Sequence, residues 1–133
     1  MKLIINTDGG SRGNPGPAGI GVVIKNEAGK VLFKKGKYIG STTNNQAEYQ
    51  AVVWAMEKAK ELGGTELEFR LDSELVVKQL KGEYKVKDSG LAQQFLKIFN
   101  AKNKFKNILF KHVRRELNAE ADAMVNVALD ENR

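Results

Sequence analysis

The sequence predicts an α/β fold in which three antiparallel strands are continued by two parallel strands in one mixed sheet flanked by helices. Two observations lead to this prediction. Three strand-like segments precede the first helical segment, and a turn at 26–29 joins the second to the third. The later strand-like segments are separated by helical ones, and such crossovers connect parallel strands. The length suits a single core, so we expect residues 1–133 to form one domain.

Each element has its own signal. Residues 2–8 form a short β-branched run that a dense turn signal follows at 9–17, so the first strand is expected to end at Asp8. Residues 66–71 alternate polar and apolar side chains, whereas 44–62 repeat small and apolar residues at helical spacing. The expected elements are strands 2–8, 18–26 and 31–39, helix 44–62, strand 66–71, helices 73–80 and 89–102, strand 107–112 and helix 118–130.

Four acidic residues stand at places where a solvated surface charge would be unexpected. Asp8 and Asp72 each follow a strand, and ligands bind at that edge of open α/β sheets. Glu48 heads the apolar stripe of helix 44–62, where a carboxylate is costly unless it is paired or binds a cation. Asp122 lies on the margin of a further stripe, formed by Leu117, Ala121, Met124, Val125 and Ala128.

Taken singly, each acid has an ordinary explanation. Asp8-Gly9 suits a hairpin, Asp72 suits a helix cap, and Glu48 and Asp122 could be charges at the boundary of a helix face. Together they indicate a site for a hard divalent cation such as Mg²⁺, which prefers oxygen ligands. Two such ions support in-line displacement at phosphorus, so the pattern predicts metal-dependent phosphodiester chemistry.

Charge and composition agree with a polyanionic substrate. Eight lysines between Lys78 and Lys106 stand against two acids, so this segment accounts for the whole net charge of +6. A solvated helical surface would explain it equally, yet lysines that neutralise phosphates suit the acidic cluster. No run is long enough to span a membrane and the N-terminus has no cleavage pattern, so we expect a cytoplasmic protein. The absence of cysteine excludes disulfides, thiolate catalysis and cysteine-ligated metal sites.

Four segments, in order along nearly the whole chain, resemble the signature segments of type 1 ribonuclease H. They are 8–16 (Asp-Gly-Gly-Ser-Arg-Gly-Asn-Pro-Gly), 43–48 (Thr-Asn-Asn-Gln-Ala-Glu), Asp72-Ser73 and 112–122, which contains Arg115-Glu116-Leu117-Asn118. The last motif is similar to that of the short bacterial and archaeal forms. Residues 81–89 are too few for a basic-protrusion helix, and no separate hybrid-binding domain is expected.

The resemblance implies a ribonuclease H-like fold and an endonuclease that cuts the RNA strand of RNA/DNA hybrids, leaving 3′-hydroxyl and 5′-phosphate ends. It implies two Mg²⁺ or Mn²⁺ ions per active site with substrate bound, and a monomer that requires no protein partner and no membrane. The acids that match the family's metal ligands are Asp8, Glu48, Asp72 and Asp122. The residues that match substrate contacts are Ser11, Gly13, Asn14, Thr43, Asn44 and Asn45.

Two positions near the last motif suggest assisting roles. His112 stands ten residues before Asp122, where many relatives carry a histidine that assists proton transfer or product release, although it could equally be a strand-end residue. Arg115 is the alternative candidate and a possible substrate contact. Glu74 departs from the family, since many relatives carry glutamine there and a carboxylate repels phosphate.

Other functions fit less well. An actin-like phosphotransferase would need a second lobe, and a noncatalytic nucleic-acid-binding module would not need all four acids. A transposase or integrase core shares the fold but usually relies on three acids and assembles on DNA ends. The pair Asn44-Asn45 before Glu48 favours the hybrid nuclease.

Overall fold

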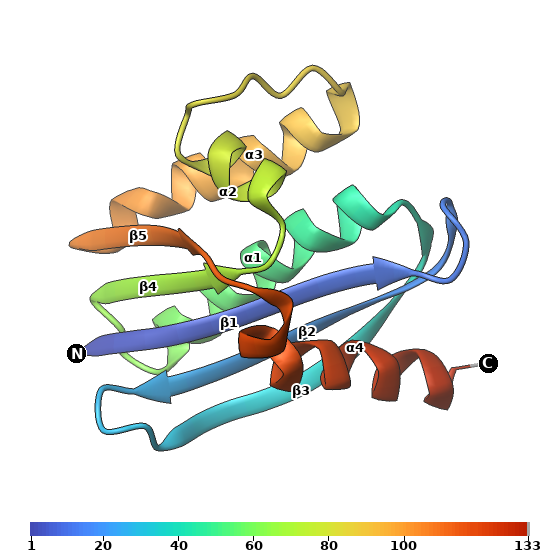
Figure 1. The fold of residues 1–133 in the computed structure, drawn as a ribbon. Coiled ribbons are helices and arrows are strands. Elements are labelled where there is room, and N and C mark those ends of the chain that lie inside the picture. Colours follow the sequence, from blue (N-terminus) through green and yellow to red (C-terminus); the bar gives the residue numbers. More distant parts are fainter. Residues whose placement is uncertain (133) are drawn as a thin grey trace.

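A five-stranded mixed sheet in the order β3-β2-β1-β4-β5 forms the centre of the molecule, as the sequence predicts (Figure 1). The structure is a computed structural model and describes residues 1–132. β1 pairs antiparallel with β2 and parallel with β4, and β4 pairs parallel with β5. The strands are β1 (Lys2–Ser11), β2 (Gly16–Asn26), β3 (Val31–Thr42), β4 (Glu66–Leu71) and β5 (Asn107–His112).

The helices cover the two faces of the sheet unequally. The helices α1 (Asn44–Glu61), α2 (Glu74–Leu80) and α3 (Ser89–Ala101) lie on one face, and α4 (Ala119–Glu131) lies alone on the other (Figure 1). The main core lies beneath α1, where Leu3, Ile5, Tyr49 and Phe69 are fully buried. In the described part of the chain, no helix is long and apolar enough to cross a membrane.

The expected loop after the first strand is much shorter than predicted. β1 continues to Ser11 and β2 begins at Gly16, so the turn contains only residues 12–15. Gly9 and Gly10 stay in the sheet because they pair with Ile20 and Gly19 of β2, and their ladder hydrogen bonds outweigh the turn preference of glycine. Asp8 is therefore inside a strand, three residues before its end, and the prediction that the strand ends at Asp8 was wrong.

The last helix also begins differently from the prediction. A short 3₁₀ turn, Arg115–Asn118, precedes α4, which starts at Ala119. Leu117 is 65% exposed and does not belong to the apolar stripe of α4, contrary to the expectation. Helical spacing does not extend through a 3₁₀ turn, which has about three residues per turn. Ala121, Val125 and Ala128 are buried as expected.

Glycines let α4 lie unusually close to the sheet. A Cβ atom at Gly21 would come within 2.2 Å of the Ala121 carbonyl oxygen, and one at Gly36 would come within 2.0 Å of the Met124 carbonyl oxygen. The backbone of α4 thus rests directly on β2 and β3. This seating determines where the first turn of α4, with its acids, meets the sheet.

Candidate active site

Three carboxylates from distant parts of the chain meet at one edge of the sheet. Asp8 of β1, Glu48 of α1 and Asp72, which follows β4, each place a carboxylate oxygen within 4.8 Å of the others. Asp8 and Glu48 are each only 7% exposed, and Asp72 is half-buried. The sequence predicts that the four acids converge, and the structure brings these three into one cluster.

Gly9 allows Asp8 and Glu48 to approach each other. A Cβ atom at Gly9 would lie 2.3 Å from the carbonyl carbon of Ala47, so the strand and the first turn of α1 touch backbone to backbone. The Gly9 amide also donates a hydrogen bond to Oε1 of Glu48 at 3.4 Å. The apolar stripe around Glu48 is confirmed, since Ala51, Val52 and Ala55 are fully buried.

Asp72 reaches the same edge through the parallel pairing of β4 with β1. The pairs Lys2 with Glu66 and Asn6 with Arg70 define a register that, when continued, places Asp72 beside Asp8. The chain then turns into α2, where the Ser73 hydroxyl caps the helix by accepting a hydrogen bond from the Val76 amide at 3.3 Å. The cap confirms the predicted strand-to-helix junction.

Asp122 joins this group from the opposite face of the sheet. It lies in the first turn of α4, is exposed, and interacts with the carboxyl group of Asp8. Its oxygens lie outside the three-carboxylate cluster, but it lines the same cavity, which has a volume of about 410 Å³. The four predicted acids therefore surround one hollow, with Asp122 at its margin.

Asn118 anchors the start of α4 to β1 and was not predicted to do so. Its amide nitrogen donates to the Thr7 carbonyl at 2.9 Å, and its Oδ1 accepts from Nδ2 of Asn6, also at 2.9 Å. The side chain is 1% exposed. A buried asparagine one turn before Asp122 positions that acid, and the only signal in the sequence was its place in the Arg-Glu-Leu-Asn motif.

We expect Asn118→Ala to lower the free energy of unfolding by about 2 kcal/mol, because it removes the two hydrogen bonds that this buried side chain makes with the Thr7 carbonyl and the Asn6 amide. Urea denaturation followed by circular dichroism measures the change. Asn103→Ala, at an exposed position beyond α3, is the control and should stay within about 0.5 kcal/mol of the wild type. Equal stability of both variants would show that Asn118 is not an anchor.

The acidic cluster is electrostatically unfavourable in the absence of a cation. Burial, followed by the charge of Asp72, raises the pKa of Asp8 from 3.8 to about 7. Burial and the neighbouring Asp8 also raise the pKa of Glu48. Oε2 of Glu48 is buried and has no hydrogen-bond partner among the described residues. An unpaired buried carboxylate oxygen beside two further carboxylates suits a divalent cation with oxygen ligands.

We expect the free energy of unfolding of the metal-free protein to fall as the pH rises from about 4 to about 7. Over this range folded Asp8 holds a proton that the unfolded chain has released, so the folded state binds more protons and loses stability as pH rises. The expected loss is on the order of 2 to 4 kcal/mol. Urea denaturation in the presence of a chelator, at pH 5 and pH 8, measures it.

Two variants test the cause of this pH dependence. Asp8→Asn removes the titrating group, so its stability should vary less with pH and should exceed that of the wild type at pH 8. Glu61→Gln removes an exposed acid at the far end of α1 that pairs with Lys58, and it should keep the wild-type slope. A wild-type stability that rises between pH 5 and pH 8 would contradict the expectation.

One wall of the cavity is formed where hydrogen bonds join the turn after β1 to the start of α1. The Asn44 side chain accepts from the Ser11 amide at 2.8 Å and from the Ser11 hydroxyl at 3.1 Å. The Asn44 amide donates to Oδ1 of Asn14 at 3.0 Å. The Ser11 hydroxyl also donates to the Gly13 carbonyl, and Gly13 adopts a φ of 90°, which favours glycine. The turn after β1 and the start of α1 are thus held together.

The remaining predicted contact residues are Thr43, Asn45 and Arg115, and each has a different local environment. Thr43 caps α1 by accepting a hydrogen bond from the Gln46 amide at 3.2 Å. Asn45 is exposed on the first turn of α1. Arg115 lines the cavity together with Asp122. Arg12 and Asn126 also line the cavity, and neither was singled out from the sequence.

His112 does not line the cavity of the acids. It ends β5, is exposed, and lies close enough to Glu74 to contribute, after Lys78, to a lowered pKa of that carboxyl. Glu74 itself pairs with Lys78 at 2.9 Å. Its charge is therefore partly neutralised by Lys78 within α2.

The basic segment, residues 78–106, begins in the last turn of α2, where its first lysine contacts an aromatic ring. The Lys78 ammonium lies 5.0 Å from the ring centre of Tyr84 and donates a hydrogen bond to its hydroxyl at 3.4 Å. Residues 81–88 contain no helix, so the expected absence of a basic-protrusion helix is confirmed.

Comparison with known proteins reveals one consistent family. The family described as "Reverse transcriptase-like" matches residues 6–128. Ribonuclease HI of Halobacterium salinarum is 42% identical over 124 residues, which cover 93% of this chain and 62% of that protein. A bifunctional protein of Mycobacterium tuberculosis is 40% identical over 98% of this chain but only 36% of its own length. The chain thus spans about a third to two thirds of these curated relatives.

Two solved structures match this chain over nearly their full length. The crystal structure of RNase H1 from Halobacterium salinarum superposes with a TM-score of 0.96, at 40% identity, and the match covers 98% of this chain and 99% of that one. LC11-RNase H1, solved in complex with an RNA/DNA hybrid, superposes with a TM-score of 0.94 at 50% identity and with 98% coverage of both chains.

Proposed function

Since the chain belongs to the ribonuclease H family, we propose that it is an endonuclease that hydrolyses the RNA strand of RNA/DNA hybrids. The observation that carries the proposal is the cluster of Asp8, Glu48 and Asp72, in which one buried carboxylate oxygen has no partner. The hybrid bound to LC11-RNase H1 indicates the class of substrate. Residues 1–133 are proposed to act as one catalytic domain.

The metal ligands are proposed to be Asp8, Glu48, Asp72 and Asp122, holding two Mg²⁺ or Mn²⁺ ions when substrate is bound. Such ions, when bound, favour deprotonation of the attacking water and offset charge on the leaving oxygen. Water adds to phosphorus, the bond to the 3′-oxygen breaks, and that oxygen takes up a proton. The products are then a 3′-hydroxyl and a 5′-phosphate.

Selection for RNA is proposed to come from the wall formed by Ser11, Asn14 and Asn44. Its amide and hydroxyl groups are already fixed by hydrogen bonds, so they can read sugars in the minor groove at little cost in conformational entropy. Glu48 is proposed to accept a hydrogen bond from the 2′-hydroxyl beside the scissile phosphate. Gly13, Thr43 and Asn45 extend this surface, Thr43 toward a phosphate of the DNA strand.

His112 and Arg115 are proposed to assist the reaction of the four acids. Arg115 lines the cavity and carries a fixed positive charge that suits a phosphate. His112, on the neighbouring strand end, would take part in proton transfer or product release near neutral pH. Its position outside the cavity favours an assisting role over direct contact in the resting protein.

We expect His112→Ala to lower kcat by about 10-fold and to leave measurable activity, because the histidine assists a step that the acids perform. Single-turnover and steady-state cleavage of a labelled hybrid measure the change. Asn107→Ala, at the other end of β5, is the control and should keep wild-type turnover. Loss of all activity in His112→Ala would place the residue at the centre of the chemistry.

The direct test of the function is a cleavage assay with three labelled substrates: RNA/DNA hybrid, RNA duplex and DNA duplex. Each is incubated with Mg²⁺, Mn²⁺ or a chelator. We expect the RNA strand of the hybrid to be cut with either metal, with 3′-hydroxyl and 5′-phosphate ends, and no cutting in chelator. The absence of hybrid cleavage with both metals would refute the proposal.

A further inference from the structure

Besides Arg115, one further cation lines the cavity of the acids, and the proposed mechanism gives it no role. This residue is Arg12, which lies in the turn between β1 and β2. The four carboxylates of the same cavity repel a polyanion, so a substrate strand gains from any positive charge placed among them. The backbone and the side chain of Arg12 both bear on what this charge does.

The backbone of Arg12 is held in place by its own turn. Its amide donates a hydrogen bond to the Pro17 carbonyl at 2.8 Å, which closes the turn between the two strands. Its carbonyl oxygen packs against Gly16, where a Cβ atom would come within 2.1 Å of that oxygen. The side chain of Arg12 therefore starts from a fixed point relative to β1 and Asp8.

The side chain of Arg12 reaches α4 through one ion pair. Its Nη2 atom donates to Oδ1 of Asp130 at 2.7 Å. The two side chains are 43% and 56% exposed, and an ion pair as exposed as this contributes little to the stability of a fold. What the pair does determine is the direction of a planar guanidinium group at the rim of the cavity.

Most of the hydrogen-bonding capacity of the guanidinium group is still available. Within the described part of the chain, Asp130 is its one partner, and the contact uses one nitrogen. Guanidinium carries its N–H donors in a rigid, planar fork, which matches two oxygens of a phosphate group. The donors of Arg12 that do not face Asp130 are therefore suited to a phosphodiester.

The position of Arg12 points to a phosphate other than the one that is cut. Arg12 lies four residues after Asp8, which corresponds to about 13 Å at the rise of a β-strand. Its partner Asp130 lies in the last turn of α4, whereas Asp122 lies in the first. A strand whose scissile phosphate is held by the acids must therefore bring another of its phosphates to Arg12.

We propose that Arg12 binds a phosphate of the RNA strand beside the scissile one, and that Asp130 positions the guanidinium group for this contact. Asp130 keeps its contact with one nitrogen while the phosphate accepts hydrogen bonds from the others. A second anchored phosphate fixes the register of the RNA strand over the acids. The inference rests on the proposed function and deepens it, because it assigns a substrate contact outside the metal cluster.

The first test measures binding of a labelled RNA/DNA hybrid to the whole protein in Ca²⁺, by fluorescence anisotropy at several salt concentrations. Arg12→Ala should raise Kd about tenfold at about 0.1 M salt, and the slope of log Kd against log salt should fall by about one. Arg12→Lys should keep the slope and raise Kd only about threefold, because lysine keeps the charge but lacks the fork. In cleavage with Mg²⁺, Arg12→Ala should raise KM by the same factor and keep kcat within about twofold.

The second test locates the phosphate. Neutral methylphosphonate groups replace the phosphates of the RNA strand one at a time, and binding is measured for the wild type and for Arg12→Ala. At the contacted position the replacement should weaken binding of the wild type about tenfold but leave binding of Arg12→Ala within about twofold, because the variant has already lost that contact. At other positions the two proteins should respond equally. The same replacements in the DNA strand should show no such difference.

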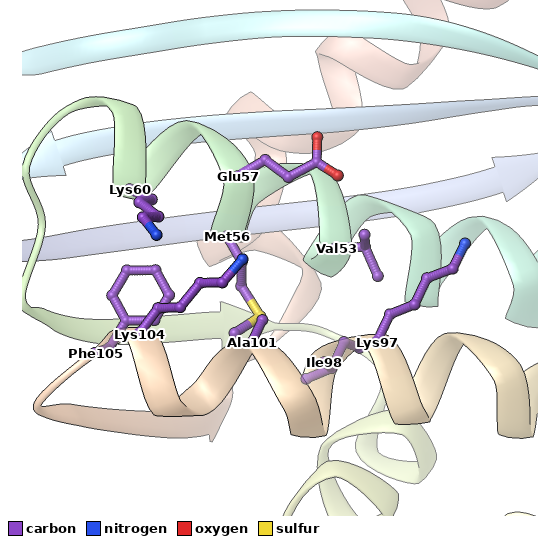
Figure 2. A pocket seen from close by; sticks show the side chains of 9 residues that line it. All are labelled: Val53, Met56, Glu57, Lys60, Lys97, Ile98, Ala101, Lys104 and Phe105. Atoms are coloured by element: carbon purple, nitrogen blue, oxygen red, sulfur yellow. The ribbon is translucent and has the colours of Figure 1, made fainter.

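Lys60→Gln is the control for the loss of one positive charge. Figure 2 shows Lys60 at a separate hollow between α1 and α3, where it is exposed. It lies twelve residues after Glu48 on α1, about 18 Å along the helix axis. This variant should bind the hybrid within about twofold of the wild type and keep its salt slope. Circular dichroism verifies that each variant is folded.

Asp130→Asn tests the positioning role, because asparagine keeps the size of the side chain but not its charge. The change should raise Kd about threefold in the wild type, since the guanidinium group must then be ordered on binding. In the Arg12→Ala background it should have no further effect, since Asp130 acts through Arg12. Tighter binding by Asp130→Asn would show that the carboxylate competes with the phosphate, and would overturn the positioning role.

Two results would overturn the contact itself. One is a Kd and a salt slope of Arg12→Ala equal to those of the wild type. The other is a phosphate scan in which Arg12 shows coupling to no phosphate of the RNA strand, or to one of the DNA strand. Failure of the proposed function is a separate outcome, because it requires that the wild type leaves the hybrid intact with both metals.

Discussion

Asp72→Asn is expected to abolish cleavage of an RNA/DNA hybrid while the protein stays folded and continues to bind the hybrid. Asparagine keeps the size of the side chain but removes one of three carboxylates whose oxygens lie within 4.8 Å of one another. The variant loses a carboxylate that is proposed to bind the metal, and also a charge that raises the pKa of Asp8. We expect a reduction of at least about 1,000-fold in kcat, equivalent to about 4 kcal/mol of transition-state stabilisation.

Three measurements separate this outcome from misfolding. Single-turnover cleavage measures the loss, electrophoretic mobility shift in the presence of Ca²⁺ measures hybrid binding, and urea denaturation measures stability. The metal-free variant should be at least as stable as the wild type at pH 8, because repulsion within the cluster is relieved. Glu61→Gln is the matched control and should cleave normally. Efficient cleavage by Asp72→Asn would refute the assignment of the site.

Gly9→Ala is expected to have the second largest effect, although it adds a single methyl group. That group would lie 2.3 Å from the Ala47 carbonyl carbon and 2.5 Å from the Glu48 amide nitrogen, so β1 and α1 must move apart. Relaxation of such backbone contacts costs about 3 kcal/mol of stability. A displacement of about 1 Å between Asp8 and Glu48 would lower cleavage by roughly 100-fold.

Gly10→Ala is the matched control for this substitution. The nearest atom to a Cβ at Gly10 is 3.9 Å away, which is an ordinary van der Waals contact. Its free energy of unfolding should therefore stay within about 1 kcal/mol of the wild type. Thermal unfolding and urea denaturation compare the two variants. Equal stability of Gly9→Ala and Gly10→Ala would show that the close approach of β1 to α1 is not required.

The sheet and the four acids that line the cavity could be predicted because their signals are local. Residues 2–8 form a β-branched run, and segments 66–71 and 44–62 show the periods of a strand and a helix, so Asp8, Asp72 and Glu48 each stand at the end of a recognisable pattern. Glu48 is the clearest example, since its helical neighbours Ala51 and Val52 are apolar and the structure buries all three. Parallel pairing then brings Asp72 to Asp8 without any further information.

The remaining features depend on contacts between segments that the sequence does not bring together. The extension of β1 through Gly10 depends on pairing with β2, and a glycine-rich segment by itself reads as a turn. The exposure of Leu117 follows from the 3₁₀ turn before α4. Asn118 is an anchor only because Thr7 and Asn6 lie beneath it, more than one hundred residues away in the sequence.

The backbone of α4 lies directly on Gly21 and Gly36, so the first turns of this helix are held in a fixed position on the sheet. When a rigid rod tilts about a fixed point, the displacement of any part grows with its distance from that point. Asp122 adjoins Ala121, whose carbonyl oxygen rests on Gly21, so it moves little. Asp130 lies eight residues farther, about 12 Å along the axis, and it holds Arg12 of the turn after β1 at 2.7 Å. A tilt of α4 about Gly21 would therefore displace Asp130 and its partner Arg12, at the rim of the cavity, more than Asp122.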